Sequence, residues 1–227
     1  MSQTLHTDPD ARSPEPLLHA SVYEILRARL ISGAIVPGDG LSTRAIALEL
    51  GVSQMPVRDA LSRLSAEGAV LIRSKRKIEV PPLTPERFSD LLGCRLLLEP
   101  EAAARSLPVL NKEAIARLRA IDAGIDRSIA DGDVHGYTEG NCAFHFTLYR
   151  ANGRNTLNRL IEALWLQFGP YMRTVYDQHP TDHFADQHRN ALDAIVAKDE
   201  QGLRRAIAAD ITDGMGLIGK RLRSSDG

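Results

Sequence analysis

Three short runs of hydrophobic positions near the start of the chain repeat with the spacing of an α-helix. They are Val22, Ile25, Leu26 and Leu30; then Ile46, Ala47 and Leu50; then Val57, Ala60, Leu61 and Leu64. Such offsets place each set on one helical face. The breaks between the runs contain glycine and proline, and Ser42 and Ser53 stand where N-cap residues are expected. The pattern therefore predicts three short helices.

Two short extended pieces, at about residues 70–73 and 78–80, follow the third run and flank a basic segment. Three helices followed by a basic β-hairpin are typical of a winged helix-turn-helix, here at residues 19–81, whose third helix enters the DNA major groove. Gln54 and Arg58 on that helix can bind bases or phosphates. On the hairpin tip, Lys75, Arg76 and Lys77 can neutralise phosphates or reach into the minor groove. The alternative is a helical bundle with a solvated basic turn.

From Thr84 onward the hydrophobic positions keep helical spacing, and no strand-like alternation is sustained. This predicts an all-α domain over residues 82–220, joined to the first unit by two prolines. The fold class expected is therefore mainly α, a winged helix-turn-helix followed by a helical-bundle effector domain. Residues 1–18 and 221–227 read as loose tails. Breaks between helices are expected near Pro108, Gly132, Gly153, Gly169-Pro170 and His179-Pro180.

Four of the predicted helices each place a polar residue where an apolar one is expected. Arg95 lies in the stripe of the helix at about 85–105, and Asn141 and His145 share an edge of the helix at about 138–151. His188 and Asp210 hold similar positions on the last two helices. Any one of them is explained by a hydrogen-bonded core residue. Together they can meet at a bundle centre, where a metal or a bound anion satisfies them, since a buried unpaired charge costs several kcal/mol.

The composition allows this interpretation without proving it. The chain has 227 residues, a net charge of −1, 43% hydrophobic residues and two cysteines. Residues 21–80 carry nine Lys and Arg against six Asp and Glu, a weakly basic balance that permits DNA binding. No apolar run approaches the ~20 residues that span a bilayer. The first residues do not form a secretory signal, so we expect a cytoplasmic protein with no membrane partner and with reduced cysteines.

The segment SGAIVPGDGLSTRAIALELGVSQMPVRDALSRLSAEGAV resembles the DNA-binding domain of GntR-family bacterial repressors. It contains the G-x-x-x-P-G turn that ends at Gly38 and the run G-V-S-x-x-P-V-R-x-A-L that begins at Gly51. Many members of the family carry arginine where this chain has Gln54, which implies a different operator sequence, and the wing tip lacks the usual glycine. The resemblance implies DNA contacts from Arg44, Ser53, Gln54, Met55, Pro56, Arg58 and the wing.

Residues 85–212 resemble the all-helical effector domain of the GntR branch that includes fatty-acid and vanillate-type regulators. Many members bind a divalent metal through an Asp-x-x-x-His pair and two later histidines, and in this chain we expect Zn, Ni or Mn. The resemblance places these ligands at Asn141, His145, His188 and Asp210, so the first Asp is replaced by Asn and the last His by Asp. It also makes Arg95 the partner of the carboxylate of a small organic acid effector.

These observations together predict a ligand-responsive transcription regulator, acting as a repressor, that binds a palindromic double-stranded operator as a homodimer. Two alternatives stay open. In the first, the metal is itself the effector. In the second, His145, His188 and Asp210 form a metal-dependent hydrolase. The hydrolase requires an open coordination position and a nearby base. The sequence identifies no such base, and this alternative gives the N-terminal unit no role.

Overall fold

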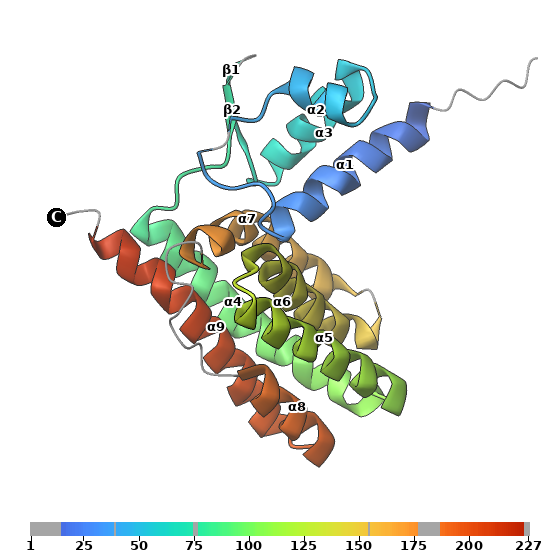
Figure 1. Cartoon of the computed structure of the whole chain (residues 1–227), viewed down its shortest axis with the longest axis vertical. Coiled ribbons are helices and arrows are strands. Elements are labelled where there is room, and N and C mark those ends of the chain that lie inside the picture. Colours follow the sequence, from blue (N-terminus) through green and yellow to red (C-terminus); the bar gives the residue numbers. More distant parts are fainter. Residues whose placement is uncertain (1–14, 39, 75–76, 154, 177–186, 225–227) are drawn as a thin grey trace, which may run out of the picture.

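A computed structural model describes residues 15–38, 40–74, 77–153, 155–176 and 187–224. A small N-terminal unit lies at one end of a bundle of long helices (Figure 1). The N-terminal unit holds a two-stranded antiparallel sheet in which Ile72 pairs with Ile78. Its elements are α1 (Glu15–Ile31), α2 (Thr43–Glu49), α3 (Gln54–Ala66), β1 (Leu71–Ser74) and β2 (Lys77–Glu79).

The predicted hydrophobic stripes form the core of the N-terminal unit. On α3, Val57, Ala60, Leu61 and Leu64 are each no more than 3% exposed. Ser42 caps α2 by accepting a hydrogen bond from the amide of Ala45. Ser53 occupies the N-cap of α3, but its hydroxyl makes no capping bond. The three helices and the hairpin predicted from the sequence are therefore all present.

Six α-helices form the described part of the bundle. They are α4 (Pro85–Ser106), α5 (Lys112–Ala130), α6 (Val134–Tyr149), α7 (Thr156–Tyr176), α8 (Gln187–Ala197) and α9 (Glu200–Ser224), with short 3-10 turns at Leu107–Val109 and Arg150–Asn152. Thr84 caps α4 by accepting from the amide of Arg87. Helix α4 packs along α9, α5 along α6, and α8 against α9. The mainly α fold class is thus confirmed.

The structure corrects the expected break at Gly169-Pro170, because α7 runs through both residues. Gly169 serves close packing rather than a turn. A Cβ at this position would lie 2.4 Å from the carbonyl oxygens of Leu30 and Ile31 at the end of α1. The absence of a side chain therefore lets the two helix backbones approach each other.

The predicted ends of the ordered chain also differ from the structure. Helix α1 begins at Glu15, inside the predicted tail, where Leu17 and Leu18 favour a helix. Helix α9 continues to Ser224. The remaining tail residues, the wing-tip residues Lys75 and Arg76, and the predicted break at His179-Pro180 lie outside the described residues.

Polar contacts as well as helix packing join the N-terminal unit to α7. Arg27 of α1 forms a 2.8 Å ion pair with Glu162. Arg87 donates hydrogen bonds to the carbonyl of Gly68 (2.9 Å) and to Gln167 (3.1 Å). The hydroxyl of Tyr171 donates to the carbonyl of Pro81 at the start of the bundle. Figure 1 shows α7 at this junction. Helix α7 is therefore the main support of the N-terminal unit.

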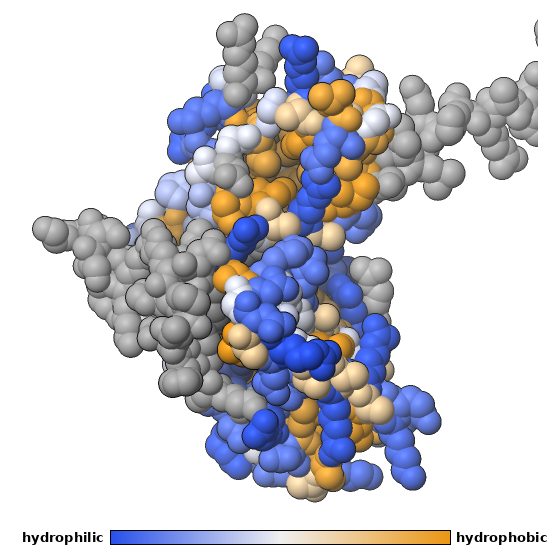
Figure 2. Space-filling view, viewed as in Figure 1, coloured by the Kyte–Doolittle hydropathy of each residue, from blue (hydrophilic) through white to orange (hydrophobic). Residues whose placement is uncertain are grey.

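Figure 2 shows hydrophobic residues between hydrophilic ones on the viewed face of the N-terminal unit. Two large apolar side chains of this unit, Leu48 and Met55, are 83% and 63% exposed. Among the described helices, none has both the length and the apolar character that crossing a membrane requires.

Candidate DNA-binding surface and metal centre

The start of α3 presents polar and apolar side chains to solvent on the face opposite its core stripe. Ser53, Gln54, Met55 and Arg58 are all exposed. The hydroxyl of Ser53 is not used for capping, and among the described residues Arg58 has no ion-pair partner. These groups can therefore contact a ligand without first losing an internal bond.

The other residues predicted to contact DNA have different environments. Arg44 on α2 is exposed, and no described carboxylate pairs with it. Lys77 on β2 is exposed but lies 3.3 Å from Glu79. Pro56 is buried in the first turn of α3, where its missing N–H costs nothing. The accessible part of the predicted surface is therefore Arg44, the start of α3 and the wing strand.

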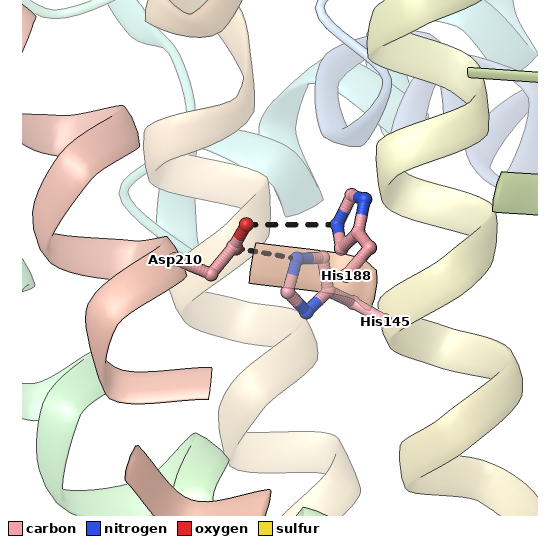
Figure 3. A group of neighbouring side chains, drawn as sticks. All are labelled: His145, His188 and Asp210. Atoms are coloured by element: carbon pink, nitrogen blue, oxygen red, sulfur yellow. Dashed lines mark ion pairs between the residues drawn. The ribbon is translucent and has the colours of Figure 1, made fainter. Parts of the chain in front are cut away.

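Three of the four predicted metal ligands lie together in the bundle (Figure 3). His145 comes from α6, His188 from α8 and Asp210 from α9. His145 Nε2 is 2.9 Å from one carboxylate oxygen of Asp210, and His188 Nε2 is 3.6 Å from the other. One ligand atom from each residue lies within 4.8 Å of the others. The structure therefore brings these three predicted residues together, and their role as metal ligands stays a prediction.

The environment of His145 fits a metal ligand. Its ring is fully buried, yet within the described chain its Nε2 makes no hydrogen bond of adequate geometry. A buried nitrogen left in this state is costly unless another group satisfies it. Two imidazoles and a carboxylate are a donor set suited to a divalent transition metal. The residues present therefore fit such an ion.

Asp210 is charged in this site. Burial raises the pKa of its carboxyl, but the charges of His145 and His188 lower it by more, to about 2. The ring of His188 is held by Phe144, whose centroid lies 4.3 Å away. An anionic carboxylate between two oriented imidazoles is an arrangement that binds cations.

Asn141, the fourth predicted ligand, is buried one helical turn before His145 on α6. This spacing places the two side chains on one face of the helix. The location is consistent with the prediction that its amide oxygen is a ligand, which stays a prediction.

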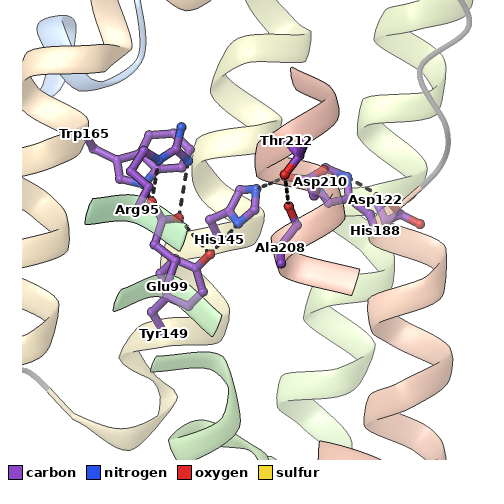
Figure 4. Close-up of polar contacts among 10 residues, drawn as sticks. All are labelled: Arg95, Glu99, Asp122, His145, Tyr149, Trp165, His188, Ala208, Asp210 and Thr212. Carbon is purple, nitrogen blue, oxygen red and sulfur yellow. Dashed lines mark hydrogen bonds and ion pairs between the residues drawn. The ribbon is translucent and has the colours of Figure 1, made fainter. Parts of the chain in front are cut away.

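Arg95 has a partner of its own. It is 3% exposed, and its guanidinium contacts the Glu99 carboxylate at 2.5 Å and 3.3 Å (Figure 4). The rings of Trp165 and Phe168 lie 4.6 Å and 4.7 Å from its central carbon. Although burial alone lowers the pKa of Arg95, Glu99 raises it more, so the residue stays charged. Its charge is thus already balanced, and its predicted contact with an effector carboxylate stays a prediction.

Four further residues lie around this centre that the sequence pattern did not single out. Tyr149 contacts both His145 and Glu99, Trp165 contacts Glu99, and Asp122 of α5 lies beside His188 (Figure 4). Glu99 and Tyr149 stand four positions after Arg95 and His145, a spacing that could have revealed them. Asp122 lies on the apolar stripe of Leu118 and Ile125, the same signal that identified Asp210.

Comparison with known proteins supports both halves of the architecture. The family described as "Bacterial regulatory proteins, gntR family" matches residues 18–80, and the FCD domain matches residues 90–213. The chain belongs to the GntR family of regulators with an FCD domain.

Individual GntR relatives are similar over most of the chain. The HTH-type transcriptional regulator McbR of Escherichia coli is 27% identical, over 88% of this chain and 92% of its own. The solved structure of E. coli McbR/YncC superposes with a TM-score of 0.82 over 92% of this chain and 99% of its own, at 26% identity. The gluconate operon repressor of Bacillus subtilis is 30% identical, over 67% of this chain and 60% of its own.

The family assignment decides between the function classes considered. The GntR relatives are transcription regulators, several of them named repressors, and not enzymes. This GntR protein is therefore a DNA-binding transcription regulator with a ligand-binding effector domain. The hydrolase alternative is withdrawn.

Proposed function

We propose that this GntR regulator is a repressor that binds a palindromic operator as a homodimer and responds to a ligand in its FCD domain. The observation that carries the DNA-binding part is the exposed start of α3, where Ser53, Gln54, Met55 and Arg58 face solvent while the opposite face is buried. Residues at the start of a recognition helix are those that reach base edges. Retardation of the upstream DNA of its own gene by the purified chain, compared with Arg58→Ala, tests the proposal.

Dimerisation is supported by the outer face of α4. Gly93, Cys94 and Leu97 are exposed along this face, and Leu97 is 76% exposed. A second copy packed there would remove this apolar side chain from water, which favours association. A symmetric dimer also suits an operator of two inverted half-sites. DNA binding further implies a cytoplasmic location.

Metal binding is supported by the geometry of His145, His188 and Asp210. We assign a divalent ion, Zn, Ni or Mn, to these three residues, with Asn141 contributing an amide oxygen. These four protein donors leave positions free in an octahedral shell such as that of Mn²⁺, so a small organic acid can complete the shell through its carboxylate. The metal-sensor alternative uses the same residues. Operator affinity measured with and without a chelator distinguishes the two, because only a metal sensor responds to the metal alone.

Helix α7 is the element best placed to carry a change at this centre to the DNA-binding unit. Trp165 on α7 donates a 3.1 Å hydrogen bond to Glu99 beside the centre. Glu162, about one turn earlier, pairs with Arg27 of α1 at 2.8 Å and with Arg150 after α6 at 2.6 Å. A ligand that favours one arrangement of α6 and α7 therefore shifts the equilibrium between positions of the DNA-binding units.

A further inference from the structure

Both histidines of the metal centre have an acidic or phenolic neighbour on the ring nitrogen that faces away from Asp210. His145 Nδ1 lies 2.8 Å from the hydroxyl of Tyr149. His188 Nδ1 lies 3.6 Å from a carboxylate oxygen of Asp122. The Nε2 atoms of the two rings face Asp210. The two rings therefore have the same orientation towards the carboxylate.

The neighbours of Nδ1 determine where each ring carries its proton. Tyr149 donates its hydroxyl hydrogen to Glu99 at 2.9 Å, so its oxygen is available to accept from His145 Nδ1–H. The carboxylate of Asp122 is an acceptor only and favours a proton on Nδ1 of His188. In the neutral form that a metal ligand requires, both rings then keep their proton on Nδ1 and present the lone pair on Nε2.

Glu99 accepts four hydrogen bonds from three residues. Arg95 donates to it through two nitrogens, and Trp165 and Tyr149 each donate one hydrogen bond. The carboxylate is fully buried, and the charge of Arg95 offsets the cost of burying it. The network runs without a gap from Arg95 through Glu99 and Tyr149 to His145 (Figure 4).

We propose that Asp122 and the Glu99–Tyr149 pair are the outer shell of the metal centre, holding His188 and His145 as Nε2 donors, with Arg95 as the counter-charge of Glu99. These residues are positioning residues and not ligands. The inference rests on the proposed metal binding at His145, His188 and Asp210. It gives Arg95 a role that needs no contact with an effector.

Two nearly isosteric variants test the two sides of the shell independently. Tyr149→Phe removes the hydroxyl beside His145, and Asp122→Asn removes the charge beside His188. We expect each to weaken Zn²⁺ binding about 10- to 100-fold, while the stoichiometry stays at one ion per chain. Asp126→Asn, exposed one turn further along α5, and Tyr23→Phe in the DNA-binding unit are matched controls that should keep wild-type affinity. If one of the two variants does not fold, the other variant still tests the proposal on the opposite side of the shell.

The visible spectrum of the Co²⁺-loaded protein supplies a readout that general destabilisation does not move. We expect the ligand-field bands to shift in Tyr149→Phe and Asp122→Asn but not in the controls. Wild-type affinity and spectra in both variants would show that Asp122 and Tyr149 do not position the histidines, although the metal centre itself would stand. Loss of all binding in Asp122→Asn, as in Asp210→Asn, would make Asp122 a ligand and overturn its assignment. Absence of Zn²⁺ and Co²⁺ binding by the wild type would instead overturn the metal centre itself.

Discussion

Arg27 of α1 and Glu162 of α7 form a 2.8 Å ion pair across the junction between the DNA-binding unit and the effector domain. The Glu162 side chain is 4% exposed and also binds Arg150. The same carboxylate therefore joins the DNA-binding unit, α6 and α7.

We expect Glu162→Gln to destabilise the protein and to reduce its sensitivity to acid. Burial raises the pKa of Glu162, but Arg150 and Arg27 lower it below its ordinary value of 4.5. Its contribution is therefore complete above pH 4.5 and is lost as the pH falls through the lower pKa of the folded state. At pH 7 the loss should be about 1–2 kcal/mol, between the values for surface and fully buried pairs, because Arg150 is 41% exposed and keeps part of its hydration.

Thermal unfolding between pH 7 and pH 3 checks this prediction. The wild type should lose more stability than Glu162→Gln over the acidic part of the range. Glu101→Gln is the matched control, since Glu101 pairs with Arg105 and Arg204 at the surface, where ion pairs contribute little. Parallel curves for the wild type and Glu162→Gln would show that the carboxylate does not stabilise the junction.

Gln54 is expected to read adenine at one operator position. It is exposed at the first position of α3, and a glutamine amide forms a bidentate pair with adenine, whereas arginine pairs with guanine. Gln54→Arg should therefore change the preferred base from adenine to guanine, a difference worth about 1–3 kcal/mol. Selection from randomised half-sites measures it. Gln201→Arg adds the same charge at an exposed position of α9 and should leave the base preference unchanged. An unchanged preference in Gln54→Arg would show that Gln54 does not read the base.

Asn141→Asp should strengthen zinc binding by about tenfold, because a carboxylate oxygen is a better donor to the cation than an amide oxygen. Asn190→Asp, exposed on α8, adds the same charge outside the centre and serves as the control. Calorimetric titration with zinc measures both. Equal affinity of wild type, Asn141→Asp and Asn141→Ala would exclude Asn141 from the ligands.

Leu97→Glu should convert the proposed dimer into monomers of about 24.9 kDa, because it places a charge in the apolar contact. Val109→Glu introduces the same charge at another exposed apolar position and should stay dimeric. Light scattering after size exclusion gives the masses. A wild-type mass of one chain, or a dimeric Leu97→Glu, would contradict the proposed interface on α4.

The sequence predicted what depends on local periodicity. The stripe from Val57 to Leu64 fixed the orientation of α3, so the same pattern identified both its buried face and the exposed Gln54 and Arg58. Likewise, the polar positions His145, His188 and Asp210 on apolar faces were sufficient to predict a shared centre. In both cases one helical repeat decides which side chains point inward.

What the sequence could not predict depends on contacts between distant helices. Trp165 reads as ordinary core, and only the fold shows its bond to Glu99, 66 positions away. Gly169 reads as a helix break because its packing partner, the end of α1, is 138 residues earlier. The ion pair of Arg27 with Glu162 spans 135 positions. No local pattern carries such information.

The central claim is that the exposed start of α3 binds an operator, and fluorescence anisotropy with DNA from upstream of its own gene tests it most directly. The wild type should bind this DNA more tightly than unrelated DNA, with an affinity that falls steeply with salt. Arg58→Ala should bind it at least about tenfold more weakly. Arg119→Ala, at an exposed position of α5, should bind it with wild-type affinity. Equal affinity of the wild type and Arg58→Ala for the upstream DNA would contradict the account.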